Sequence, residues 1–131
     1  MTGSEYSPTR ETQRILAFLC RQSHALNLPP AVADNQHTVR FHSTADQIIF
    51  PIPFKETETL AALKAIEALV AAELANLRFG QRQRNVSISL EAATYFGCQA
   101  YMAKVGGLGK LDPEVRSKLK GCFPPSYSDK W

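Results

Sequence analysis

A stretch of alanine and leucine from about Glu56 to Arg78 constrains the fold of this chain more than any other segment. Its larger apolar residues recur at spacings of three and four, which is the period of a buried helical stripe: Leu60, Leu63, Ile66, Val70, Leu74 and Leu77. The alanines between them raise helix propensity and let a neighbouring helix approach closely on a second face. The segment therefore predicts one long central helix with little of its surface exposed.

The residues before this helix predict a shorter one and then a loop. Ser7 and Pro8 are suited to the N-cap and the first helical position, because the missing N–H of proline costs nothing there. We expect this helix to end before Asn27, because Pro29 and Pro30 follow and proline cannot continue the hydrogen-bond ladder. Residues 27–37 are predicted to form a loop.

Two short strands and two further helices are expected around the central one. Residues 38–42 and 86–90 alternate polar and apolar side chains, as half-buried strands do, and Gly80 can supply a left-handed end to the central helix. Helices are predicted from about 91 to 105 and from Pro113 to Gly121, and residues 123–131 read as an irregular tail. The expected fold is a helix-rich α/β piece, with residues 1–131 forming one domain.

Composition excludes several classes of function. The chain has 15 basic and 12 acidic residues spread along its length, and its densest basic run, Arg78, Arg82 and Arg84, lacks interleaved aromatics, so nucleic acid is not an expected partner. We interpret that run as a solvated helix end, with an anion contact as the alternative. No segment approaches the ~18 apolar residues of a membrane span, no signal core is present, and three cysteines form no CxxC pair. A soluble, cytoplasmic protein with reduced thiols and no membrane partner is expected.

The usual catalytic and ligand-binding motifs are missing from the sequence. The run Gly106–Lys110 lacks the spacing and the Ser or Thr of a Walker A loop, the three histidines have no metal-ligand spacing, and there is no GxSxG elbow. Two carboxylates remain, Glu56 and Glu58, at the start of the central helix. They could simply favour the positive end of the helix dipole. They could also present a nucleophile or a base at the lip of a loop.

At this point the sequence resembles the class III CoA-transferases of the CaiB/BaiF type, a family that includes the alpha-methylacyl-CoA racemases. The resemblance covers residues 12–120 and rests on one block: Phe50-Pro-Ile-Pro-Phe-Lys55, the alanine-rich helix that ends Ala72-Glu-Leu-Ala-Asn-Leu-Arg78, and Phe79-Gly-Gln-Arg-Gln-Arg-Asn-Val-Ser-Ile-Ser-Leu90. The family has an acid, an Ala/Leu-rich helix, a T-G-R-G-Q turn and a V-D-V-S-L strand in this order. Gly80 and Gln83 match the turn, whereas Phe79, Gln81, Arg82 and Ser87 depart from the pattern.

The resemblance implies a site and its substrates. The family's catalytic aspartate falls at or very near Glu58, which would then attack an acyl-CoA thioester, form a mixed anhydride and carry CoA to a second carboxylic acid. Lys55, Gly80 and Gln83 are the expected substrate-binding residues. Coenzyme A would be present as the thioester substrate, with no permanently bound cofactor and no metal.

Complete family members are several hundred residues long and close their site within an interlocked dimer, so this chain resembles a partial, truncated member. We expect a second copy or a complementing chain to complete the site, because the central helix has more apolar surface than so small a chain can cover. Two alternatives stay open. One is a non-catalytic assembly or regulatory remnant of the family, and the other is an alpha-methylacyl-CoA racemase-like epimerase that uses the same acid.

Overall fold

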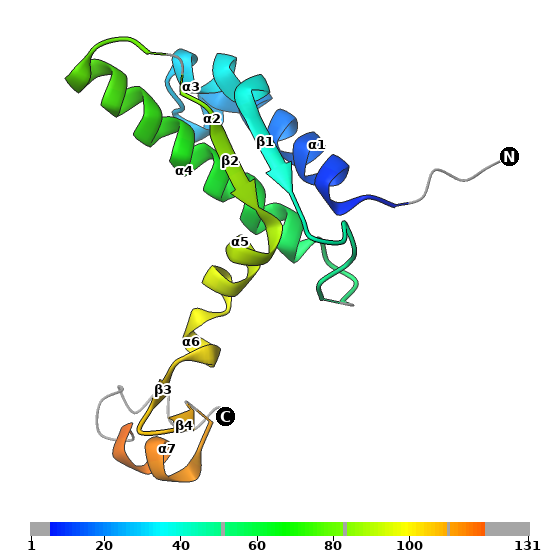
Figure 1. Cartoon of the computed structure of the whole chain (residues 1–131), viewed down its shortest axis with the longest axis vertical. Helices are drawn as coiled ribbons and strands as arrows, with labels where there is room; N and C mark the ends of the chain where they lie inside the picture. The colour runs from blue at the N-terminus through cyan, green and yellow to red at the C-terminus, as the bar shows by residue number, and fades with distance from the viewer. Residues whose placement is uncertain (1–5, 51, 83, 110, 120–131) are drawn as a thin grey trace, which may run out of the picture. The chain divides into compact units, whose positions relative to one another are not determined.

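The computed structural model describes residues 6–50, 52–82, 84–109 and 111–119. The chain divides into two units, residues 1–94 and residues 95–131, and each is considered separately. The first unit holds helices α1 to α4 and a parallel pair of strands, β1 and β2 (Figure 1). The fold is therefore helix-rich α/β, as the sequence predicted.

Helix α1 (Pro8–Arg21) begins as the sequence predicted. The Ser7 hydroxyl accepts a hydrogen bond from the Arg10 N–H at 3.2 Å, and Pro8 occupies the first turn. Thr12, Leu16 and Cys20 recur every four residues and are all buried, so they form the face that packs into the core. The helix ends earlier than expected, at Arg21 with Gln22 as its C-cap, and a single further turn, α2 (Ser23–Leu26), leads to Asn27 in the left-handed conformation.

The loop predicted for residues 27–37 is wrong in its second part. Helix α3 (Pro30–Asp34) and the 3-10 turn η1 (Asn35–Thr38) occupy it. Pro30 sits in the first turn of α3, where proline is well tolerated, so the proline pair begins a helix as well as ending one. Val32, on α3, is 1% exposed and belongs to the main apolar cluster.

Helix α4 (Glu56–Phe79) confirms the long central helix. The prediction that its stripe of larger apolar residues is buried is wrong in part, because Leu63, Leu74 and Leu77 are exposed and the alanine-rich face packs into the core instead. Ala61, Ala62 and Ala65 are fully buried, and Leu69 is 4% exposed. Alanine at these positions lets α1 and β2 approach the helix backbone closely. Gly80 ends the helix with φ of 86° and ψ of 154°, so the positive φ is confirmed while ψ is extended rather than left-handed helical.

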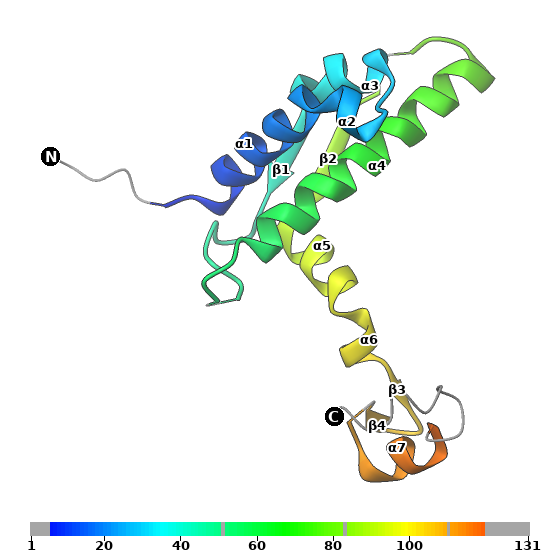
Figure 2. The ribbon, with the colours of Figure 1, turned by 180° about the vertical axis from the view of Figure 1, so that it is seen from behind.

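Strands β1 (Val39–His42) and β2 (Val86–Ser89) pair in parallel, with Val39 opposite Val86 and Phe41 opposite Ile88. Parallel neighbours need a long crossover, and α4 is that crossover. Figures 1 and 2 show α1 and α4 on the same side of the two strands. The alternation places the apolar side chains toward these helices and leaves Arg40, His42 and Ser87 exposed, with the Ser87 hydroxyl 3.2 Å from His42 Nδ1.

The helix predicted for residues 91–105 is wrong in its second half. Helix α5 (Leu90–Gly97) stops at Gly97, and α6 (Gln99–Met102) adds one turn. Strands β3 (Lys104–Val105) and β4 (Leu108–Gly109) then form an antiparallel hairpin. Gly106 and Gly107 both have positive φ, which a two-residue hairpin turn demands. Helix α7 (Pro113–Leu119) follows, and the predicted tail lies outside the described residues.

Candidate functional site at the start of α4

The two acids at the start of α4 have different surroundings. Glu58 is 5% exposed, whereas Glu56 points into solvent. The N–H groups of the first helical turn have no partners within the helix, so a carboxylate here lies at the positive end of the helix dipole. Dipole stabilisation alone requires no burial, and the burial of Glu58 therefore distinguishes it from its neighbour Glu56.

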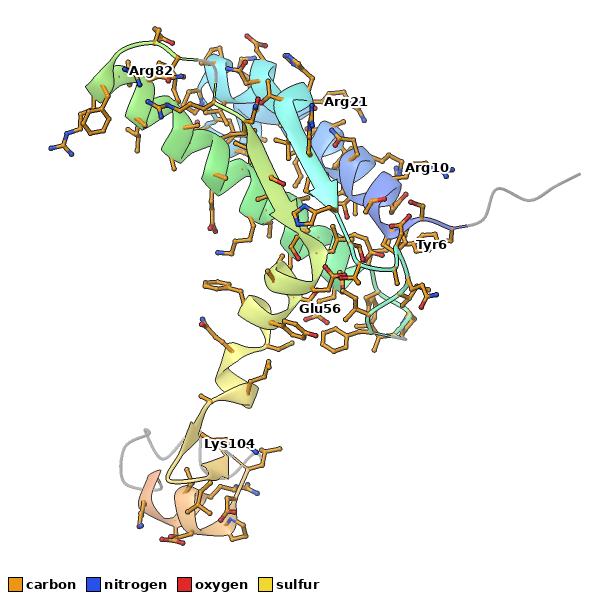
Figure 3. The ribbon with its side chains drawn as sticks, in the orientation of Figure 1. Tyr6, Arg10, Arg21, Glu56, Arg82 and Lys104 are labelled. Carbon is orange, nitrogen blue, oxygen red and sulfur yellow. The ribbon has the colours of Figure 1, made fainter. Side chains whose placement is uncertain are left out.

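The Glu58 carboxylate is held by a residue that lies 52 positions earlier in the sequence. Its Oε1 accepts a hydrogen bond from the Tyr6 hydroxyl at 2.6 Å. Figure 3 shows Tyr6, before α1, and Glu56, in the first turn of α4, at the same end of the unit. Burial, followed by the hydrogen bond to Glu58 and the charge of that carboxylate, raises the pKa of Tyr6 well above its ordinary value of 10.0. The phenol therefore keeps its proton near pH 7 and acts as a hydrogen-bond donor to Glu58.

A hollow of about 200 Å³ opens beside these two residues. Most of its wall comes from the turn that leads into α4, and it is lined by Tyr6, Ile48, Ile49, Phe50, Ile52, Pro53, Phe54, Lys55, Thr57 and Glu58. Pro53, the isoleucines and the aromatic residues give this turn an apolar inner surface. A single carboxylate is thus presented to an apolar hollow, where electrostatic interactions are stronger than in water.

Lys55 lines the same hollow, but its charge is engaged elsewhere. Its ammonium lies 2.5 Å from Glu11 Oε1 and 5.7 Å from the centre of the Tyr6 ring. Hydrogen bonds from Arg14 and then from Lys55 lower the pKa of Glu11 to about 2. The group of Glu11, Arg14 and Lys55 joins α1 to the start of α4 and flanks the Tyr6 ring.

Two buried hydroxyl groups, those of Thr57 and Thr94, lie in contact at the start of α4. The Thr57 and Thr94 hydroxyls lie 3.2 Å apart, and Thr94 donates to the Leu90 carbonyl at 2.7 Å. Thr57 is 5% exposed and Thr94 is fully buried. This contact joins the first turn of α4 to α5 and fixes the direction in which the helix leaves the loop.

The predicted substrate-binding turn lies far from Glu58 within this chain. Gly80 follows Glu58 by 22 residues along an unbroken helix, which corresponds to roughly 33 Å at the usual rise. Gln83 lies outside the described residues. Of the predicted site residues, the structure therefore brings Glu58 and Lys55 together, and it does not bring Gly80 to them.

A second hollow, of about 330 Å³, lies at the far end of α4. Arg84 Nε donates to Asn76 Oδ1 at 2.9 Å, and the Arg82 N–H donates to the same oxygen at 3.3 Å. Glu73 also lines this hollow, so both signs of charge meet there. Arg78 stacks on the Phe79 ring at 5.8 Å. Of the basic run, only Arg78 lies in α4, and Arg82 and Arg84 follow the helix end and line the hollow.

Three contributors to the Glu58 site were missed by the sequence argument: Tyr6, Glu11 and Thr94. Tyr6 lies 52 residues before Glu58 and Thr94 lies 36 residues after it, and no local spacing connects them.

Among the described residues, no group of three or more His, Cys, Asp or Glu could hold a metal ion. No helix in the described ranges is both long and apolar enough to cross a membrane.

The acetyl-coenzyme A transferase nodX of Hypoxylon pulicicidum is similar to this chain. The two are 33% identical over 87 residues, which is 66% of this chain and 14% of nodX. No family model matches the sequence, and no solved structure matches it. The chain is therefore similar to a CoA transferase, and it spans a small part of that relative's length.

Proposed function

We propose that this chain is a class III CoA-transferase-like protein in which the Glu58 carboxylate moves CoA between an acyl-CoA and a carboxylic acid. The observation that carries the proposal is the position of Glu58, which is buried at a helix N-terminus beside an apolar hollow and held by a neutral hydroxyl donor. The similarity to an acetyl-coenzyme A transferase supports it independently.

The chemistry follows from the reactivity of a carboxylate toward a thioester. Glu58 attacks the acyl carbonyl, the C–S bond breaks, and CoA leaves as a thiolate while a mixed anhydride forms. The thiolate attacks the Glu58 carbonyl of that anhydride, which releases the first acid and gives a glutamyl-CoA thioester. The second acid attacks this thioester and displaces CoA, and the returning thiolate takes the new acyl group and restores Glu58.

The hollow suits this sequence of steps in two ways. Glu58 itself is 5% exposed and the hollow beside it is lined mainly by apolar side chains, which limits the access of water that would hydrolyse an anhydride. The free N–H groups of the first α4 turn, which has no side-chain N-cap, are donors for negative charge that develops on a carbonyl oxygen. Both features act at the position where the thioester would meet Glu58.

A second copy of the chain, or a complementing chain, completes the proposed protein. Opposite its buried alanines, α4 carries Leu63, Leu74 and Leu77, which are 44%, 61% and 72% exposed. These spacings put the three leucines on one face of the helix. Complete burial of a leucine side chain contributes roughly 1.5–3 kcal/mol, so a partner that covers this leucine face would gain several times that value. Gly80 and its turn would then be free to serve a site in the partner.

The partner proposal is tested by mass in solution. Light scattering over a range of concentrations should give a dimeric or larger mass for the wild-type chain. The double variant Leu74→Glu/Leu77→Glu should have a smaller mass in solution, because the two carboxylates place charge on the leucine face and prevent association. Ser87→Glu, on the exposed side of the sheet, is the matched control. A monomeric wild-type chain would leave only the complementing chain as the partner.

The activity is tested by acyl exchange, with acyl-CoA and a second, labelled carboxylic acid as substrates. Glu58→Gln should abolish exchange because an amide cannot form the anhydride. Glu56→Gln removes the same charge two residues away on the exposed side and should keep nearly full activity. If Glu58→Gln exchanges CoA as fast as an active wild type, Glu58 is not the nucleophile. If the wild type exchanges no CoA, the transferase proposal is wrong, and a non-catalytic assembly role explains the chain better.

A further inference from the structure

We propose that Tyr6 is the positioning residue of the Glu58 site: its hydroxyl fixes the carboxylate through Oε1, so that Oε2 is the oxygen that attacks the thioester. This inference rests on the proposed transferase function and assigns a role to a residue outside the family block. Tyr6 precedes α1, and the 2.6 Å hydrogen bond joins it to Glu58 across 52 residues of sequence.

The Tyr6 ring is itself held in place. The Lys55 ammonium lies over the ring at 5.7 Å, and Glu11 anchors that ammonium at 2.5 Å. Arg14 in turn holds Glu11, with Nη2 to Oε1 at 2.6 Å. The phenol is therefore placed by an ordered group of charges on α1 and at the start of α4, although the Tyr6 residue is 43% exposed.

A fixed carboxylate matters because glutamate is long. Its side chain has one more rotatable bond than aspartate and can place its oxygens in many positions, and a misplacement of about 1 Å costs on the order of a hundredfold in rate. The Tyr6 hydrogen bond removes that freedom at one oxygen and leaves the other for the substrate. An aspartate at this position would have less need of such a tie, so Tyr6 offsets the freedom of the longer acid.

Tyr6 acts as a hydrogen-bond donor and does not transfer its proton. Burial and the nearby Glu58 charge keep the phenol pKa far above neutrality, and a general acid works best when its pKa lies near the working pH. The reaction steps also need no proton from Tyr6, because carboxylates and thiolates are the species that attack and leave. The role is therefore one of geometry.

The kinetic test compares Tyr6→Phe with the wild-type chain in the acyl-exchange assay. We expect kcat to fall by about ten- to a hundredfold, with KM nearly unchanged because the aromatic ring and the hollow persist. The double variant Tyr6→Phe/Glu58→Asp should regain part of the lost kcat, because the shorter acid has less freedom. Tyr95→Phe, at an exposed tyrosine outside the hollow, is the control and should behave as the wild type.

A spectroscopic test detects the pair without any activity. Ultraviolet titration of tyrosine ionisation, with the Tyr6→Phe curve subtracted, should place the Tyr6 pKa above 10.0 in the wild type. Glu58→Gln should move it down, and Glu56→Gln should leave it unchanged. Circular dichroism along the titration shows that the fold persists. If the chain unfolds at alkaline pH, a protected hydroxyl proton resonance near neutral pH, lost in Tyr6→Phe, replaces the titration.

The two tests separate this inference from the proposed function. An active wild type with a fully active Tyr6→Phe variant would overturn the positioning role and keep the transferase. An inactive wild type whose Tyr6 pKa falls in Glu58→Gln would overturn the transferase, and the pair would be a structural contact. A Tyr6 pKa that is ordinary and insensitive to Glu58→Gln would overturn the inference directly.

Discussion

The alanine face of α4 gives a sharp prediction about packing, because the same substitution can be made on both sides of one helix. Ala65 is fully buried in the cluster that includes Leu16, Ala62 and Leu69, whereas Ala71 is exposed. Leucine and alanine are both good helix formers. Ala65→Leu and Ala71→Leu therefore differ almost entirely in whether the new side chain has room.

The magnitude at Ala65 follows from two opposed effects. Three added carbons would contribute about 2.4 kcal/mol if they could be buried without strain, at about 0.8 kcal/mol each. A fully buried alanine between packed helices leaves no such room, and overpacking a core costs typically 1–3 kcal/mol. We expect the strain to dominate, so that Ala65→Leu lowers the free energy of unfolding by about 1–3 kcal/mol. Ala71→Leu should change it by less than about 0.5 kcal/mol.

The assay is urea unfolding followed by circular dichroism, with all variants at one low concentration so that association does not contribute. Equal m-values would show that both variants unfold to similar states. If Ala65→Leu were as stable as Ala71→Leu, the α1–α4 contact would have space for a larger side chain. The account of close packing through alanine would then be refuted.

Two further predictions concern the end of α4 and the acid stability of the first unit. Gly80→Ala should lower the free energy of unfolding by about 1–3 kcal/mol, because φ of 86° with extended ψ suits only glycine; Gly109→Ala, which has open space and no positive φ, should be nearly neutral in the same unfolding assay. Hydrogen bonds, first from the Ser43 hydroxyl and then from the Thr44 N–H, lower the pKa of Glu91 from 4.5 to about 2. A depressed folded-state pKa stabilises the fold above pH 4.5 and loses that contribution as pH falls toward 2. The free energy of unfolding of Glu91→Gln should therefore be lower than that of the wild type by about 1 kcal/mol at pH 7, a value that allows for screening of the interaction by solvent. The two proteins should differ little in stability near pH 2. An equal difference in stability at both pH values would contradict the assignment.

Local signals in the sequence predicted the elements whose causes are local. Ser7 and Pro8 begin α1, and the three-and-four spacing of leucines gives α4 nearly to the residue. The strand at residues 38–42 was also found, because its alternation reflects one face packed on helices. In each case the deciding interaction lies within a few positions of the residue that signals it.

The errors arose where one residue type has two opposite uses. The sequence argument predicts that Pro30 only ends a helix, yet it begins α3. Gly97 was passed over within a helical pattern, although it ends α5. The helix predicted to end at about residue 105 makes the pair Gly106–Gly107 a helix stop, whereas it is the turn of a hairpin. The surrounding packing, which the sequence does not display, selects between the two uses.

The candidate site shows the same limit more strongly. Glu58 could be identified because it lies in the first turn of a recognisable helix and in the block that resembles the class III CoA-transferases. Nothing in the sequence shows that Glu58 is buried and Glu56 exposed, because burial depends on the folded turn before α4. Tyr6 had no signal at all, since its hydrogen bond to Glu58 exists only after α1 and α4 pack together.

The central claim is that Glu58 becomes covalently activated by an acyl-CoA. The most direct measurement is to incubate the chain with an acyl-CoA, add hydroxylamine to convert any activated carboxylate into a hydroxamate, and locate the modification by mass spectrometry. Trypsin cleavage at Lys55 and Lys64 releases a peptide that contains both Glu56 and Glu58, and fragmentation distinguishes them. The account predicts a hydroxamate at Glu58 and an unmodified Glu56. No modification of the peptide, or equal modification of the two acids, would contradict it.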